Sequence, residues 1–126
     1  MVKASDEEFD AMVSDAIDSI PKRFLDELDN VVFLVEDEPS AEQVADDVAD
    51  GGTGDMLGLY SGVNLYDRGD YYSGDLPDSI TIFKGPHERM CGSAEELAEE
   101  VRRTVVHEVG HYFGMDEGQL DEMGYA

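Results

Sequence analysis

Residues 93–114 read SAEELAEEVRRTVVHEVGHYFG, and this stretch carries the clearest structural pattern in the chain. Ser93 and Glu96 have the three-residue spacing of a helix-capping box. Side chains suited to a buried face then follow at helical spacing: Leu97, Val101, Thr104, Val105 and Tyr112. Gly114 suits a helix C-terminus, because glycine adopts the left-handed conformation that ends many helices. The stretch therefore predicts one long amphipathic helix.

The predicted helix contains the motif HEVGH at residues 107–111, which has the form HExxH. Residues four apart lie on the same face of a helix, so His107 and His111 can both bind one zinc ion. Glu108 follows the first histidine directly and cannot bind the same metal in the same way. Its carboxylate can instead act as general base toward a metal-activated water. The spacing thus indicates a hydrolytic zinc centre with His107 and His111 as ligands and Glu108 as the catalytic residue.

The residues after His111 extend the motif to HExxHxxGxxE. If Gly114 turns the chain back, Glu117 can supply a third zinc ligand and leave the fourth position open, as in catalytic zinc sites. The neighbouring Asp116 is an alternative ligand if the turn differs, and two histidines completed by water alone are a second alternative. Either carboxylate can also be ordinary acidic surface.

Other segments outside this helix predict a second amphipathic helix and three strands. Ser5 and Glu8 form another capping box at the start of a helix that ends near Pro21. Proline suits the first turn of a short helix, which we expect over 21–28, and a weaker helix is expected over 41–48. Apolar runs predict strands at 31–35, 57–63 and 79–83, the last broken at residues 85–86. The 64–78 connection is long enough to suggest a functional loop or substrate flap.

Composition limits the classes of function. The chain has 126 residues, enough for one domain, and 31 acidic against 8 basic residues, so its net charge is −23. That charge argues against binding to nucleic acids or anionic membranes, and no apolar run approaches the length of a membrane span. The N-terminus does not resemble a signal peptide, so we expect a cytoplasmic protein. The acidity is explained by a solvated surface on a soluble monomer, by attraction of cationic partners or metal ions, or by adaptation to a salty cytoplasm.

Several lesser candidates have simpler interpretations. His87 is expected in an exposed loop, with a metal-binding role as the alternative. Cys91 is the single cysteine, which excludes an internal disulfide and a cysteine-based zinc site, and we expect it to be a small packed residue. Tyr112 is expected to point into the core. Met123 and Tyr125 are expected in the core and at the terminus, although a methionine turn beneath the metal is an alternative.

The motif resembles the metzincin-type pattern HExxHxxGxxH/D, and the chain as a whole resembles the small bacterial zincin-like metallopeptidases called minimal zincins. The resemblance covers roughly residues 6–125 and is carried by segments 29–32, 36–39, 58–63, 76–86 and 107–125. It implies an α+β, zincin-like fold in which a short mixed sheet packs against an N-terminal helix and the HExxH helix. It also implies zinc at His107 and His111 with Glu108 as base. This chain has Glu117 where the family usually has aspartate.

The resulting hypothesis is that residues 1–126 form a single metallopeptidase domain with one zinc ion per chain. It would hydrolyse a peptide or protein substrate. In zincins the substrate commonly lies antiparallel along an edge strand, and residues 79–83 are the predicted position of that strand. One rival is a non-catalytic zinc-binding module that acts through protein–protein contacts. Another is a peptidase whose cleft is completed by a partner.

Overall fold

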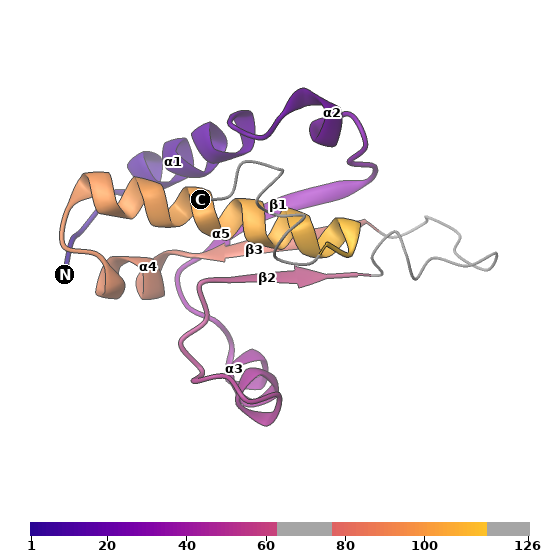
Figure 1. The fold of residues 1–126 in the computed structure, drawn as a ribbon. Helices are drawn as coiled ribbons and strands as arrows, with labels where there is room; N and C mark the ends of the chain where they lie inside the picture. The colour runs from indigo at the N-terminus through magenta and orange to yellow at the C-terminus, as the bar shows by residue number, and fades with distance from the viewer. Residues whose placement is uncertain (63–76, 116–126) are drawn as a thin grey trace.

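The computed structural model describes residues 1–62 and 77–115 of the chain (Figure 1). Within these residues the elements are, in order, α1 (Asp6–Asp18), α2 (Lys22–Leu25), β1 (Val31–Glu36), α3 (Ala41–Ala49), β2 (Gly58–Ser61), β3 (Asp78–Phe83), α4 (Lys84–Met90) and α5 (Ala94–Phe113). The long helix α5 runs along the sheet, and α1 packs beside it (Figure 1). The architecture is α+β, as the family resemblance implies. No helix in the described part is long and apolar enough to cross a membrane.

The three described strands form a mixed sheet in the order β1–β3–β2. β3 pairs in parallel with β1 and antiparallel with β2, so both of its edges are hydrogen-bonded. The expectation that residues 79–83 form an edge strand open to a peptide is therefore wrong. Ile80, Ile82 and Phe83 are fully buried in this central strand. Within the described sheet, β1 and β2 form the edges.

The two main helices begin where their capping residues predict. Ser5 accepts a hydrogen bond from the Glu8 backbone at 3.1 Å, and the Glu8 carboxylate accepts one from the Ser5 backbone at 2.9 Å. In α5 only half of this arrangement forms: Ser93 accepts from the Glu96 backbone, while the Glu96 carboxylate binds the Gly92 N–H instead. Gly114 ends α5 in the left-handed conformation, with a φ of 69°. These contacts satisfy backbone groups that a helix end would otherwise leave without partners.

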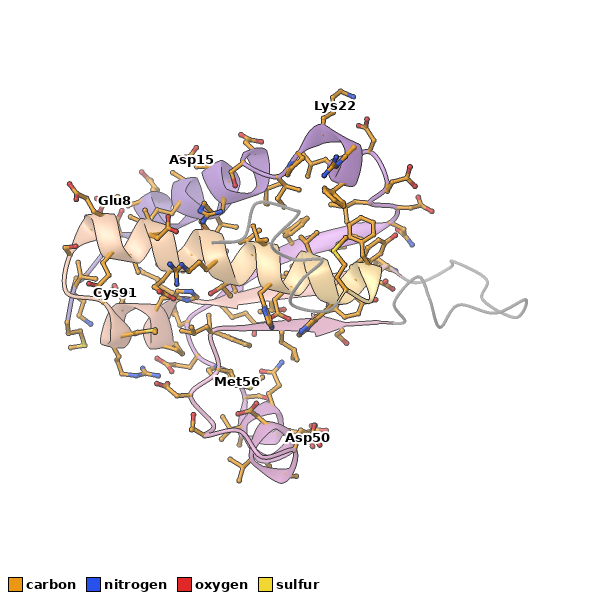
Figure 2. The ribbon with its side chains drawn as sticks, viewed as in Figure 1. Glu8, Asp15, Lys22, Asp50, Met56 and Cys91 are labelled. Carbon is orange, nitrogen blue, oxygen red and sulfur yellow. The ribbon has the colours of Figure 1, made fainter. Side chains whose placement is uncertain are left out.

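The core lies where α1 and α5 meet the sheet. Its members are buried apolar residues from these three elements, namely Phe9, Val13, Ala16, Ile80, Ile82, Leu97, Val101, Val105 and Val109. Burial of each of the larger side chains, such as Phe9, Ile80 or Leu97, stabilises the fold by roughly 1.5–3 kcal/mol relative to exposure to water. Acidic residues such as Asp15 and Asp50 are exposed at the periphery (Figure 2). The core thus anchors one face of α5.

Helix α4 was not expected from the sequence, because a Gly-Pro pair normally indicates a break. Here Pro86 lies in the first turn of the helix, where a missing N–H removes no intrahelical bond. The helix carries His87 into the interior, with no exposed surface, so the expectation of an exposed loop histidine is wrong. Proximity to β3 and α5 therefore decides the conformation of this segment.

Candidate metal centre

The HExxH residues lie on the last two turns of α5, and the structure brings their side chains together. One ligand atom from each of His107, Glu108 and His111 lies within 4.8 Å of the others. The two imidazole centroids are 4.5 Å apart. Glu108 is buried, His107 is half-buried and His111 is exposed, so the cluster extends from the interior of the protein to its surface. Two imidazoles and a carboxylate are donors that suit zinc.

A contact within the cluster orients the ring of His111. The Nδ1 atom of His111 lies 3.1 Å from Oε1 of Glu108. Because a carboxylate oxygen accepts, Nδ1 is the donor in this contact. Contacts of this kind orient metal-binding histidines in many metalloproteins. The donor set and its geometry therefore fit a zinc ion.

Strand β2 approaches α5 closely at the buried carboxylate. A Cβ atom added to Gly58 would lie 3.1 Å from Cγ of Glu108 and 2.7 Å from Cγ2 of Thr104. Only glycine permits this approach without displacing one of these side chains. The first residue of an edge strand is thus in contact with the glutamate of the motif.

A cavity of about 390 Å³ opens beside His107 and Glu108. One wall is α5 and the other is the segment between α3 and β2, where Met56 lies (Figure 2). Its lining residues come from α5, from α3, from the segment that follows α3 and from the start of β2: Asp47, Gly52, Thr53, Asp55, Met56, Leu57, Gly58, Glu100, Arg103, Thr104, His107 and Glu108. The cavity places a concave surface next to the candidate metal ligands.

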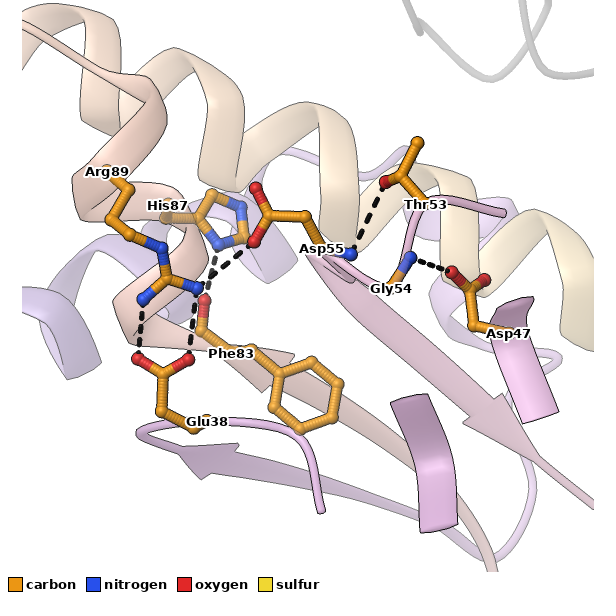
Figure 3. Close-up of polar contacts among 8 residues, drawn as sticks. All are labelled: Glu38, Asp47, Thr53, Gly54, Asp55, Phe83, His87 and Arg89. Atoms are coloured by element: carbon orange, nitrogen blue, oxygen red, sulfur yellow. Dashed lines mark hydrogen bonds and ion pairs between the residues drawn. The ribbon is translucent and has the colours of Figure 1, made fainter. Parts of the chain in front are cut away.

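Arg89 binds one of the lining residues, Asp55, and also Glu38 (Figure 3). Its guanidinium donates to both carboxylate oxygens of Glu38, at 2.7 and 3.0 Å, and to Asp55 at 3.0 Å. These carboxylates, Glu38 first, raise the pKa of Arg89 above its ordinary value. Asp47 accepts a hydrogen bond from the Gly54 N–H at 2.9 Å and fixes the same segment (Figure 3). Sequence reasoning missed Arg89, because its partners lie 51 and 34 residues away.

His87 lies outside the metal-binding cluster of the described residues and has a structural environment instead. Its Nδ1 atom donates to the Phe83 carbonyl at 2.7 Å (Figure 3), because a carbonyl oxygen can only accept. Its Nε2 atom lies 2.9 Å from the hydroxyl of Thr104, which lines the cavity. Burial lowers the pKa of His87 below its ordinary value of 6.5. The alternative of a metal-binding His87 therefore receives no support from the described geometry.

The lowered pKa of His87 predicts a pH dependence of stability. As the pH falls below about 6.5, the unfolded chain binds a proton at His87 that the folded chain resists, so the free energy of unfolding decreases. The stabilisation is complete above that pH and is lost as the pH falls toward the lowered folded-state pKa. We expect His87→Gln to show a shallower decline of melting temperature than the native protein between about pH 7 and pH 5. Thermal melts of both proteins in chelator, which removes metal effects, measure this. Parallel pH profiles would contradict it.

Other side chains considered from the sequence are packing residues. Cys91 is buried, and burial raises the pKa of its thiol, so it is a packed residue as expected. Tyr112 is fully buried, as expected, and its hydroxyl accepts a hydrogen bond from the Asp29 N–H at 3.2 Å. Tyr60 donates to Asp78 at 2.8 Å and packs edge-on against Tyr112. The 64–76 part of the predicted loop, Asp116, Glu117, Met123 and Tyr125 lie outside the described residues.

Two imidazoles four residues apart on a helix, with a buried glutamate between them, define the class of zinc-binding hydrolytic centres with the HExxH motif. A family model described as zincin-like metallopeptidase matches residues 28–125. The chain therefore belongs to the zincin-like metallopeptidase family, a family that implies zinc as cofactor and peptides or proteins as substrates. No curated protein matches the chain.

Proposed function

We propose that residues 1–126 form a single zinc-dependent peptidase domain with one zinc ion per chain. His107 and His111 would bind the metal, and Glu117 would complete the ligand set. The observation that carries this proposal is the grouping of His107, Glu108 and His111 within 4.8 Å, next to a cavity. Membership of a metallopeptidase family supports the same activity.

Zinc bound there would supply a Lewis acid that polarises the scissile carbonyl and makes water a stronger nucleophile at neutral pH. Glu108 would accept the proton of the attacking water at its carboxylate and deliver it to the leaving amine nitrogen. Its burial, and its contacts with Gly58 and His111, restrict the directions in which the carboxylate can point. The two histidines would hold the metal and take no part in proton transfer.

The substrate backbone has a suitable position along β2. This strand is an edge of the described sheet, and its first residue, Gly58, contacts Glu108. An extended peptide that paired with the edge of β2 opposite β3 would pass directly beside the general base. The other edge, β1, is separated from β2 by the central β3 and is a poorer candidate. We therefore assign strand addition to β2 instead of residues 79–83.

The third ligand can be tested by substitution. Glu117→Gln is expected to weaken zinc affinity by about tenfold or more, because an amide is a poorer zinc ligand than a carboxylate. Glu117→Asp should be tolerated better, since the family usually has aspartate there, and Asp116→Asn should have little effect. Competition with a fluorescent chelator measures the affinities. If Asp116→Asn causes the larger loss, the ligand is Asp116; if neither changes zinc binding, two histidines are the only protein ligands.

Digestion of a peptide library tests the function as a whole. We expect cleavage by the zinc-loaded protein, none after treatment with a chelator, and recovery when one equivalent of zinc is returned. Cleavage that persists in chelator would point to a contaminating protease. Stoichiometric zinc binding with no cleavage of any peptide would instead support the non-catalytic zinc-binding module.

A further inference from the structure

We propose that the cavity between α5 and residues 52–58 is a specificity subsite for a lysine or arginine side chain next to the scissile bond, with Glu100 as the residue that selects it. The inference rests on the proposed peptidase function and extends it to a class of substrate. It depends on how the cavity is connected to Glu108, on the chemistry of its walls, and on the partners of its charged groups.

The cavity and the candidate general base share one face of α5. Glu100, Thr104, His107 and Glu108 stand at positions i, i+4, i+7 and i+8, and all four line the cavity. Residues at these spacings lie along a single stripe of a helix. Glu100 is therefore about two helical turns from Glu108 on the same surface. A residue flanking the scissile bond can direct its side chain along this stripe.

The walls offer both an apolar surface and carboxylates. Met56 and Leu57 belong to the segment opposite α5, and they can cover the methylene groups of a long side chain. Four lining residues carry carboxylates, Asp47, Asp55, Glu100 and Glu108, and one is an arginine, Arg103. A long side chain with an apolar stem and a cationic end matches this combination. An anionic side chain would meet four carboxylates and a single guanidinium.

The carboxylates differ in how far other groups already neutralise them. Asp55 pairs with Arg89 at 3.0 Å, and Asp47 accepts from the Gly54 N–H. Arg103 is directed to Glu99, with Nε 3.5 Å from Oε1. In the described part of the chain, the Glu100 carboxylate makes no hydrogen bond or ion pair. Among the lining carboxylates other than Glu108, Glu100 is therefore the one that can take up a substrate cation without giving up a hydrogen bond or ion pair to the described residues.

Binding to the zinc-loaded Glu108→Gln protein tests the subsite without turnover. The ligands are short peptides in which one position carries lysine, arginine, norleucine or glutamate. Separate sets of peptides place this variable residue at each position of the peptide in turn. At one position we expect lysine and arginine peptides to bind about tenfold more tightly than norleucine peptides.

Adding Glu100→Gln should remove most of that difference. Glu95→Gln is the matched control, because Glu95 is an exposed carboxylate of α5 that does not line the cavity, and the difference should persist. Calorimetry measures the affinities, and thermal melts verify folding.

The outcomes separate this inference from the proposed function. Equal affinity for lysine and norleucine peptides at every position would overturn the proposed subsite. A preference for glutamate peptides would also overturn it and would indicate that the cavity binds anionic side chains through Arg103. A cationic preference that survives Glu100→Gln would overturn the role of Glu100. If the native protein cleaves no peptide yet binds lysine peptides selectively through Glu100, the peptidase proposal fails and the cation-binding cavity stands.

Discussion

Glu108→Gln is expected to reduce the rate of peptide hydrolysis by a factor of about 10² to 10⁴, which is the contribution typical of a positioned general base. Glutamine has nearly the same shape but cannot accept the proton of the attacking water. Glu108 is buried and lies against Gly58 and His111, so the substitution preserves the packing of α5 and β2. Zinc content should remain at one ion per chain. A fluorogenic peptide reports the rate, and elemental analysis reports the zinc.

Glu95→Gln is the control for this experiment. Glu95 is also on α5 but is exposed in its first turn, away from the metal cluster. Its substitution should leave both rate and zinc content unchanged. Full activity in Glu108→Gln would show that another group accepts the proton. Loss of zinc from Glu108→Gln would mean that this carboxylate binds the metal or holds His111 in place.

His107→Ala and His111→Ala are each expected to weaken zinc binding by at least about 100-fold. Loss of a residue that only orients a zinc ligand lowers metal affinity by about 10- to 100-fold. Each of these substitutions removes a ligand itself, so we expect a larger effect. The fold should survive, because His111 is exposed, His107 is half-buried and the core of α5 is formed by other residues. Competition with a chromophoric chelator measures the affinity, and circular dichroism monitors helix content.

His87→Gln is the histidine control, because the buried His87 binds Phe83 and Thr104 and lies outside the cluster. It should retain zinc even if its melting temperature falls. Unchanged zinc binding in both His107→Ala and His111→Ala would refute the metal centre. Loss of zinc in His87→Gln without unfolding would show that the third histidine contributes to it.

Much of the fold was predictable because the relevant signals are local. The capping pair of Ser5 and Glu8, the helical spacing of apolar residues and the glycine at position 114 indicate where α1 and α5 begin and end. The apolar runs predict the three described strands to within two residues at each end, apart from their pairing. Helix α4 was missed, because a Gly-Pro pair normally indicates a break in regular structure. In this helix Pro86 lies in the first turn, where proline is tolerated.

Less of the candidate site was predictable, because its parts come from distant segments. The order β1–β3–β2 makes 78–83 a central strand, and an apolar run looks the same in sequence whether its edges are paired or free. Arg89 joins carboxylates that lie 51 and 34 residues away, and no local pattern marks such a pair. The cavity depends on the approach of residues 52–58 to α5. The periodicity of apolar residues does not predict that approach either.

By itself the sequence determined the helix and the motif that it carries. A spacing of four residues places His107 and His111 on one helical face in any fold, because the helical repeat is a property of the backbone. Only the tertiary structure decided that β2 starts against Glu108, that Glu100 shares a cavity with it, and that His87 is buried. These contacts join segments that are far apart in the chain. They are selected by the burial of a common core, which local residue preferences do not specify.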